Sequence, residues 1–357
     1  MINKIKLAFY FFAKILGVFA LARHLTASKV RILCYHGGSI GDEWKYNGKL
    51  FMTRKKFEKR VAWLQIHGYQ ISSLSEAVAF SISDENPPRL VTALTFDDGW
   101  YSTGRELLPV LSESKLPATL YLCTSHFEEA WPIFDVTVRY ILWRVEGRKI
   151  EIKGFDNMVD GAYDLKINLS RKELIAKIMN LLAMQVKNRA QALSTLNRFA
   201  AAMGGVPGGI NLESRRFDYL SADELRELAA NGCAIELHGH FHSYPAGNPE
   251  QFFQDLTTCG SIIEKLGLPK PKHYCYPSGD FDSAAAAVLQ KLEIDSATTC
   301  IPGLIESAQG NRKYYLPRFL DGENVHMLEF EAEISGFSDV LRRAVGRSQA
   351  KYASDFM

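Results

Sequence analysis

Two adjacent carboxylates follow an apolar segment and could carry acid–base or metal chemistry. Leu90–Phe96 is rich in β-branched and apolar residues, which predicts a buried strand, and Asp97, Asp98 and Gly99 come directly after it. In an α/β fold the carboxyl ends of the strands face the active-site crevice, so we expect both acids to lie there. The alternative is an ordinary Asp-Asp-Gly turn without chemistry.

A cluster of three histidines follows a second predicted strand. Cys233–Leu237 is short and mostly apolar, and His238, His240 and His242 lie within the next five residues. The spacing of four between His238 and His242 lets their imidazoles converge if the segment turns helically. Two neutral imidazoles and one carboxylate form a three-ligand site with open positions, which suits a metal that activates water. Core or surface histidines without a ligand are the alternative.

Several sequence segments together resemble the motifs of one known family. Thr95–Gly99, His238 with His242, and Tyr274–Gly279 are similar to the first three motifs of the polysaccharide deacetylase family, the NodB homology domain, and occur in its order. Two further stretches resemble the branch of that family that acts on poly-N-acetylglucosamine. These are Arg31–His36 near the start of the chain, and Thr298–Thr299 with Leu316–Arg318 near its end. The resemblance covers residues 30–320.

Strands and helices alternate along most of the chain, which predicts a mostly parallel sheet or barrel. About seven strand–helix units predict an α/β fold of the distorted (β/α)7 barrel type. We expect the deacetylase-like domain at 30–325, preceded by an apolar helix within 1–29 and followed by a C-terminal tail, 326–357, with helical character near 340–345. Strands are predicted at 30–35, 90–96, 118–123, 233–237, 273–276, 296–300 and 314–318, and helices at 54–67, 73–80, 101–114, 221–231, 249–266 and 283–292.

The alternation breaks for about ninety residues, from 125 to 217. This segment predicts a helix ending near Trp143, a short strand at 149–153, and two helices at 171–186 and 189–203. An insertion between two barrel strands would overhang the crevice and could shape substrate specificity. It could equally just cover hydrophobic surface, since nothing in it has a chemical signature.

Composition limits the possible functions of the chain. With 357 residues, 47% of them hydrophobic, and a formal net charge of +2, it can bury a large core, and the near-zero charge argues against nucleic acid as a partner. The six cysteines contain no C-x-x-C pair, so we interpret them as small buried hydrophobes in a reducing compartment. Disulfides remain an alternative. The expected location is therefore cytoplasmic.

The N-terminal segment is apolar and ambiguous. Leu7–Ala22 is interrupted only by Lys14 and, at sixteen residues, is shorter than the ~20 that span a bilayer. A lysine near the middle would cost a further ~2.5–3.5 kcal/mol in a membrane core. We expect a helix that packs on the domain or lies in the membrane interface, giving peripheral contact with the inner membrane through residues 1–24. A cleaved signal peptide, export and membrane anchoring remain alternatives.

The resemblance assigns roles to individual residues. It implies that Asp98, His238 and His242 hold a divalent metal, for which zinc is preferred, and that Asp97 is the base that deprotonates the attacking water. In the branch that this chain resembles, the proton donor for the leaving amine lies in the N-terminal Tyr-His, which indicates His36. The weaker candidate for that donor is His326.

The sequence also departs from the family pattern. The third motif lacks the arginine that orients the base, and Arg318 is the candidate replacement because a guanidinium on Asp97 would keep it ionised. Gly239 stands where Ser or Thr is usual, and His240 is an additional imidazole that could replace one of the metal ligands. The residues expected to contact substrate are Trp100, Tyr276, Pro277 and Ser278.

These assignments predict a metal-dependent hydrolase that removes N-acetyl, or a similar acyl group, from an amino sugar. The expected substrate is an N-acetylated polysaccharide, oligosaccharide or glycolipid, and the expected context is cell-surface glycan biosynthesis. Two alternatives remain open. One is a non-catalytic carbohydrate-binding relative, against which the complete set of acids and histidines argues. The other is a metal hydrolase of non-sugar C–N bonds, against which aromatic residues near the crevice argue.

Overall fold

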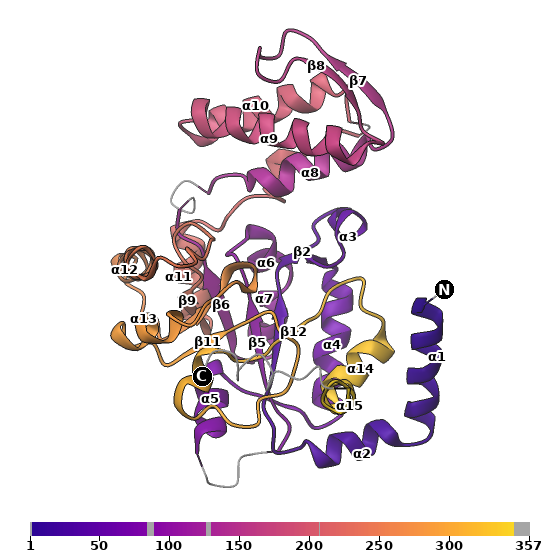
Figure 1. The fold of residues 1–357 in the computed structure, drawn as a ribbon, viewed down its shortest axis with the longest axis vertical. Helices are drawn as coiled ribbons and strands as arrows, with labels where there is room; N and C mark the ends of the chain where they lie inside the picture. Colours follow the sequence, from indigo (N-terminus) through magenta and orange to yellow (C-terminus); the bar gives the residue numbers. More distant parts are fainter. Residues whose placement is uncertain (1, 84–88, 126–129, 207, 346–357) are drawn as a thin grey trace.

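One curled, parallel sheet forms the centre of the molecule (Figure 1). The computed structural model describes residues 2–83, 89–125, 130–206 and 208–345. Three of its inner strands are buried along their whole length, which explains why their sequences are mostly apolar without an alternating pattern. In spatial order the strands are β11 (Ser296–Thr298), β10 (His273–Cys275), β9 (Cys233–Leu237), β6 (Ala118–Leu122), β5 (Val91–Phe96), β1 (Arg31–Tyr35) and β12 (Phe319–Leu320), and β4 (Gln70–Ile71) pairs with the start of β5.

The sheet closes only partly. An isolated parallel bridge between Thr298 and Leu316 joins β11, at one end of the strand order, to the segment that precedes β12, at the other end. The central pairing is long, because β1 and β5 are in register from Arg31 opposite Thr92 to Tyr35 opposite Phe96. The predicted α/β fold, a distorted barrel, is confirmed in this partly closed form.

Helices cover the outside of the sheet, and local sequence signals set their ends. Ser73 with Glu76 and Ser221 with Glu224 form capping boxes at the starts of α5 and α11. The predicted single helix within 101–114 is instead two helices, because Pro109 lacks a backbone N–H and its ring disturbs the preceding turn. The covering helices are α4 (Arg54–Ile66), α5 (Leu74–Ile82), α6 (Tyr101–Glu106), α7 (Leu108–Glu113), α11 (Ala222–Ala230), α12 (Pro249–Lys265) and α13 (Ala285–Lys291).

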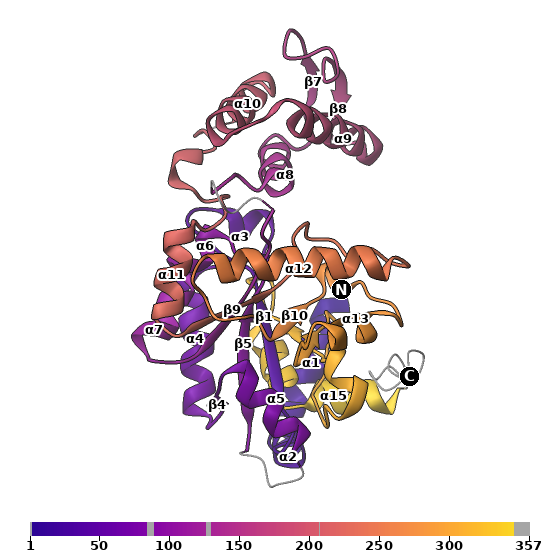
Figure 2. The same ribbon diagram turned by 90° about the vertical axis from the view of Figure 1, so that its left-hand side faces the viewer.

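The insertion forms a separate layer above the carboxyl ends of the strands, at the top of Figures 1 and 2. It has its own buried core, in which Ile141, Leu174 and Phe199 take part. Its two connecting segments pair with each other through Pro132 and Asp218. The elements at this end are α8 (Phe134–Arg144), β7 (Lys149–Ile152), β8 (Gly161–Asp164), α9 (Asn168–Gln185), α10 (Arg189–Ala202), and, from the segment after β1, β2 (Gly37–Gly38), α3 (Glu43–Tyr46) and β3 (Phe51–Met52).

Both ends of the described chain are helical and pack together. α1 (Ile2–Ile15) and α2 (Val18–Leu25) lie against α14 (Met327–Ile334) and α15 (Phe337–Ala344), so the last two helices occupy much of the segment expected as a tail. In the part of the chain that the structure describes, no single helix has both the length and the apolar character to cross a membrane, although α1 and α2 together, bent by 75°, meet that test.

Candidate active site

The two adjacent aspartates lie at the end of β5, in a turn with unusual backbone angles. Asp98 has φ +76° and Gly99 has φ +82°, both in the left-handed region. A side chain at Gly99 would also collide with Leu122, because its Cβ would lie 2.5 Å from Leu122 Cδ1. This turn allows Asp97 and Asp98, although adjacent, to line the same cavity.

Arg318 orients the carboxylate of Asp97 through two hydrogen bonds. Its guanidinium donates from Nη1 to Asp97 Oδ1 at 2.7 Å and from Nη2 to Asp97 Oδ2 at 2.8 Å, and both side chains are almost fully buried. It also donates to Thr95 Oγ1 and to the Thr299 carbonyl, each at 3.1 Å. Burial alone would raise the pKa of Asp97, but Arg318 outweighs it and holds that pKa well below the ordinary range. Asp97 is therefore ionised and rigidly oriented.

Asp98, His238 and His242 converge on one point. Asp98 Oδ1 lies 3.2 Å from His238 Nε2 and 3.1 Å from His242 Nε2. The other nitrogen of His238, Nδ1, lies 2.8 Å from the Cys275 carbonyl oxygen, to which it can only donate. This bond leaves Nε2 with its lone pair directed toward Asp98.

This donor set fits a divalent metal. Among the described residues Asp98 Oδ1 is buried without a hydrogen-bond donor, which is costly unless another group satisfies it. Two imidazole nitrogens and a carboxylate are ligands that zinc accepts, and three protein ligands leave a position open for water or substrate. Cys123 also lies within this group, and its buried thiol donates a hydrogen bond to the His238 carbonyl oxygen at 3.5 Å.

The histidine loop reaches this geometry without the helical turn that the spacing suggested. The segment after β9 is a series of bends in which Gly239 has φ +83° and His242 has φ +50°. Asp255 of α12, which the sequence analysis missed, accepts hydrogen bonds from the backbone N–H groups of His240 and Phe241 at 2.8 and 3.2 Å. A Cβ on Gly239 would lie 2.8 Å from Asp255 Oδ2, which explains the glycine at this position.

The other candidate histidines lie in different surroundings. His36 follows β1 and lines the cavity, with Nε2 3.9 Å from Asp97 Oδ2 and with Nδ1 buried without a partner. Burial lowers the pKa of His36 below its ordinary value, so at neutral pH its ring is uncharged. His240 Nδ1 instead lies 2.9 Å from Thr124 Oγ1, and His326 caps the start of α14, so neither lines this cavity.

The site opens into a cavity of about 460 Å³. Trp100 and Ser278 line it, as expected of substrate-contacting residues, whereas Tyr276 and Pro277 are buried and do not. Tyr276 packs edge-on against the ring of Tyr274 and lies away from this cavity, and its contact with substrate stays a prediction. The remaining lining residues are Leu50, Tyr219 and Cys300, together with Pro132, Ile133, Phe134, Asp135, Val136 and Met179 from the insertion.

Cys300 departs from the prediction that the cysteines are buried. All six are free, and five are buried as expected, but Cys300 is exposed in this cavity. It lies two residues beyond the end of β11.

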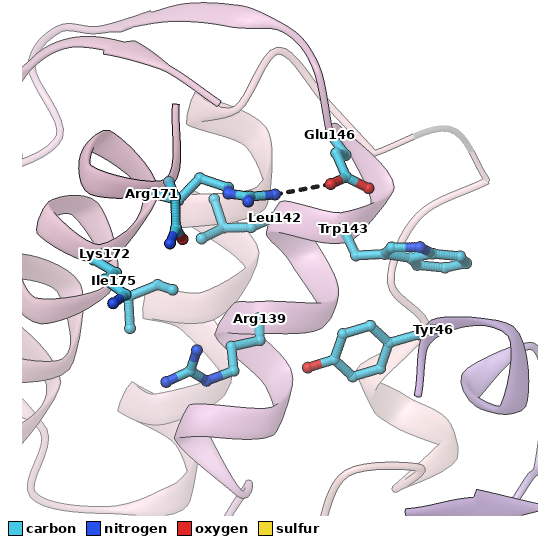
Figure 3. Close-up of a pocket in the computed structure, with 9 residues that line it drawn as sticks. Tyr46, Arg139, Leu142, Trp143, Glu146, Arg171, Lys172 and Ile175 are labelled. Carbon is cyan, nitrogen blue, oxygen red and sulfur yellow. Dashed lines mark hydrogen bonds and ion pairs between the residues drawn. The ribbon is translucent and has the colours of Figure 1, made fainter. Parts of the chain in front are cut away.

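A second cavity, of about 330 Å³, lies farther along the insertion (Figure 3). It shares α8 and α9 with the first: Asp135 and Met179 line the first cavity, while Arg139 and Ile175, each one helical turn away, line the second. Its walls combine the aromatic rings of Tyr46 and Trp143, 5.8 Å apart, with three basic side chains and one acidic one. The complete lining is Tyr46, Arg139, Leu142, Trp143, Glu146, Asn168, Arg171, Lys172 and Ile175.

Solved structures share this fold. The deacetylase PplD of Streptococcus pyogenes, solved with acetate, aligns with a TM-score of 0.56 at 16% identity over 87% of this chain and 99% of PplD. IcaB of Ammonifex degensii aligns with a TM-score of 0.52 at 15% identity over 86% of this chain and 97% of IcaB. At these identities the likeness shows the fold.

Sequence comparison identifies the family. YxkH of Bacillus subtilis strain 168, named for polysaccharide deacetylases, is 32% identical over 95 residues, so the match spans 27% of this chain and about a third (32%) of YxkH. The sequence model of the family described as polysaccharide deacetylase matches residues 84–156 and 184–297, together more than half of the chain. The chain therefore belongs to the polysaccharide deacetylase family.

Proposed function

We propose that this protein is a metal-dependent deacetylase that removes an N-acetyl group from an amino sugar in a glycan or glycolipid, within cell-surface glycan biosynthesis. The observation that carries the proposal is the convergence of Asp98, His238 and His242 beside an ionised Asp97 at the base of one cavity. An acid–base residue next to a three-ligand metal site can activate a water for attack on an unactivated amide.

Asp98, His238 and His242 would hold the metal, and we infer zinc from the nitrogen and oxygen donors. When bound, the metal would lower the pKa of water and polarise the acetamide carbonyl. The protein itself supplies orientation: Arg318 fixes the Asp97 carboxylate, and the Cys275 carbonyl fixes the ring of His238.

Proton movement follows from the relative basicity of two side chains. Asp97 accepts the proton of the attacking water, but with its pKa held well below the ordinary range it retains that proton weakly. His36 Nε2 lies 3.9 Å from Asp97 Oδ2, and a neutral imidazole is the stronger base. The relative basicities therefore favour transfer of the proton from Asp97 to His36, and because 3.9 Å is too long for a direct hydrogen bond, a bridging water would carry it. His36 would then donate this proton to the nitrogen of the departing amine.

The insertion would select the substrate. Phe134 and Met179 extend over the catalytic cavity, and the second cavity continues along the same two helices past Trp143. Aromatic faces suit pyranose rings, so sugars next to the reacting one would contact this surface. Trp143→Ala should raise KM for longer oligosaccharides at nearly unchanged kcat and leave the shortest substrate unaffected. A uniform change on all lengths would exclude this role.

The direct test is acetate release from a panel of N-acetylated oligosaccharides, with zinc supplied or removed by a chelator. We expect release that depends on zinc and a fall in kcat of about 10²–10⁴ in Asp97→Asn, which should still bind zinc. A protein that binds the sugars but releases no acetate in either condition would instead be a carbohydrate-binding relative. Hydrolysis restricted to non-sugar amides would instead identify the protein as a metal hydrolase of non-sugar C–N bonds.

A further inference from the structure

The N-terminal helices are fixed to the domain along one face. Tyr10 of α1 and Phe19 of α2 are buried with Phe337 of α15, and the rings of Phe19 and Phe337 are 5.1 Å apart. Two ion pairs strengthen this contact, since Lys6 lies 2.8 Å from Glu329 and Lys14 lies 2.6 Å from Glu331. The helices are therefore part of the folded unit.

The opposite face of the same helices is apolar and open. Its large side chains are 49–77% exposed. On α1, Ile5, Phe9 and Phe12 follow one another at spacings of four and three and form a stripe, and Phe11 and Ile15 widen it on one side. A continuous exposed apolar surface on a folded domain marks a binding surface. We call it the N-terminal apolar face; it consists of Ile5, Phe9, Phe11, Phe12, Ile15, Leu16, Leu21 and Leu25.

The charge around this face indicates what it binds. Residues 1–41 contain no acidic residue. Lys6, Lys14 and Lys29 pair with Glu329, Glu331 and Glu306, and Lys4 and Arg23 are further basic side chains that are not buried. If a second copy of the chain covered this face, Lys4 and Arg23 of the two copies would lie near one another and repel. An anionic lipid surface offers both apolar depth and opposite charge.

The geometry favours lying on a membrane over crossing it. The inner face of α1 and α2 is occupied by α14 and α15, so lipid can reach only the outer face. α1 also bends away from α2 by 75°. An amphipathic helix with one face buried in protein or water and one in lipid lies in the plane of the interface.

We propose that α1 and α2 dock this protein on an anionic bilayer by inserting the N-terminal apolar face into the headgroup region. α2 leads into the amino end of β1, whereas the catalytic residues follow the carboxyl ends of the strands, at the opposite end of the sheet (Figure 1). Docking leaves the catalytic cavity open. This inference is independent of the proposed reaction.

The test is sedimentation of the full chain with vesicles of phosphatidylcholine, alone or mixed with phosphatidylglycerol. We expect sedimentation with the mixed vesicles, weakened by salt, and less with the neutral ones. Phe12→Ser combined with Leu16→Ser should lower the apparent vesicle affinity by about tenfold or more, because two large apolar side chains leave the lipid. Lys4→Gln should weaken only the binding to mixed vesicles.

Ile66 and Leu169 provide matched controls, because they are 80% and 76% exposed on α4 and α9. Ile66→Ser and Leu169→Ser should sediment like the wild type, and all variants should keep the wild-type melting temperature. Equal loss in the controls would overturn the proposal, as would failure of the wild type to bind the mixed vesicles. A dimer in solution that Phe12→Ser with Leu16→Ser dissociates would show that a second copy covers this face.

Discussion

The buried pair of Arg318 and Asp97 allows a test in which stability and pH dependence must change together. Arg318→Met keeps the length of the side chain but removes the guanidinium, which leaves a buried carboxylate without its counter-charge. Breaking one partner of a buried pair costs ~3–5 kcal/mol of unfolding free energy. Asp97→Asn should cost a similar amount, because it leaves the guanidinium unpaired. The double variant buries neither charge, so it should be more stable than Arg318→Met alone.

The sign of the pH dependence should reverse in Arg318→Met. In the wild type the pKa of Asp97 is below its unfolded value of about 3.9, so the pair stabilises the protein above that pH and this stabilisation is lost as pH falls. Without Arg318, burial dominates and should raise the pKa of Asp97 above the unfolded value. The folded variant then binds the proton more tightly, so its stability should rise as pH falls from 7 toward 4.

Urea unfolding of the four proteins between pH 4 and 8, with metal removed, measures both effects. Subtracting the double variant removes the contributions of all other titrating groups. The acidic limb of the rate profile of Arg318→Met should also move to higher pH, provided that enough folded protein remains. Two results would refute an ionised pair between Arg318 and Asp97. One is a double variant whose loss of unfolding free energy equals the sum of the two single losses, and the other is an Arg318→Met variant whose stability changes with pH in the same direction as that of the wild type.

Three further predictions concern histidines. His238→Ala and His242→Ala should each strongly reduce bound zinc, measured by elemental analysis, whereas His240→Ala in the same loop should retain it; full zinc content in both of the first two would exclude the site. His36→Ala should lower kcat on acetamides by roughly 10²–10⁴, and less on an aryl acetate whose phenolate leaves without a proton; equal losses on both would assign it to folding or binding. Burial lowers the pKa of His273 to about 4, so protonation of the unfolded chain should cost ~3 kcal/mol of stability between pH 6.5 and 4. A urea series on His273→Asn that shows the same acid loss would contradict this.

Much of the architecture could be predicted from local sequence because the signals were strong. Continuous apolar strands such as Val91–Phe96 occur only where a sheet is covered on both sides, and the capping boxes mark helix starts. The acids and histidines could be placed at the strand ends because turns follow those strands directly. Tyr276 shows the limit of this reasoning. It is the first residue after β10, a position from which a side chain can reach the crevice, but the rings of Tyr274 and Tyr315 pack against its side chain.

Contacts between distant segments decide what local sequence could not. From the sequence, Asp255 is one of several polar residues on a predicted helix. Only the tertiary structure shows that α12 packs against the histidine loop, where Asp255 accepts hydrogen bonds from two backbone N–H groups. Cys300 looked like its apolar neighbours until the fold placed it, exposed, in the catalytic cavity.

The backbone of the site also required the tertiary structure. Asp98, His242 and Ser278, from three separate loops, have φ of +76°, +50° and +57°, angles that non-glycine residues rarely adopt. Each such residue costs of order 1–3 kcal/mol and persists only where its surroundings enforce it. Local sequence propensity favours negative φ at all three residues. At His242, for example, the spacing from His238 suggested a helical turn. All three line the same cavity. The strain thus lies where the side chains must converge, and the buried sheet below supplies the rigidity that holds it.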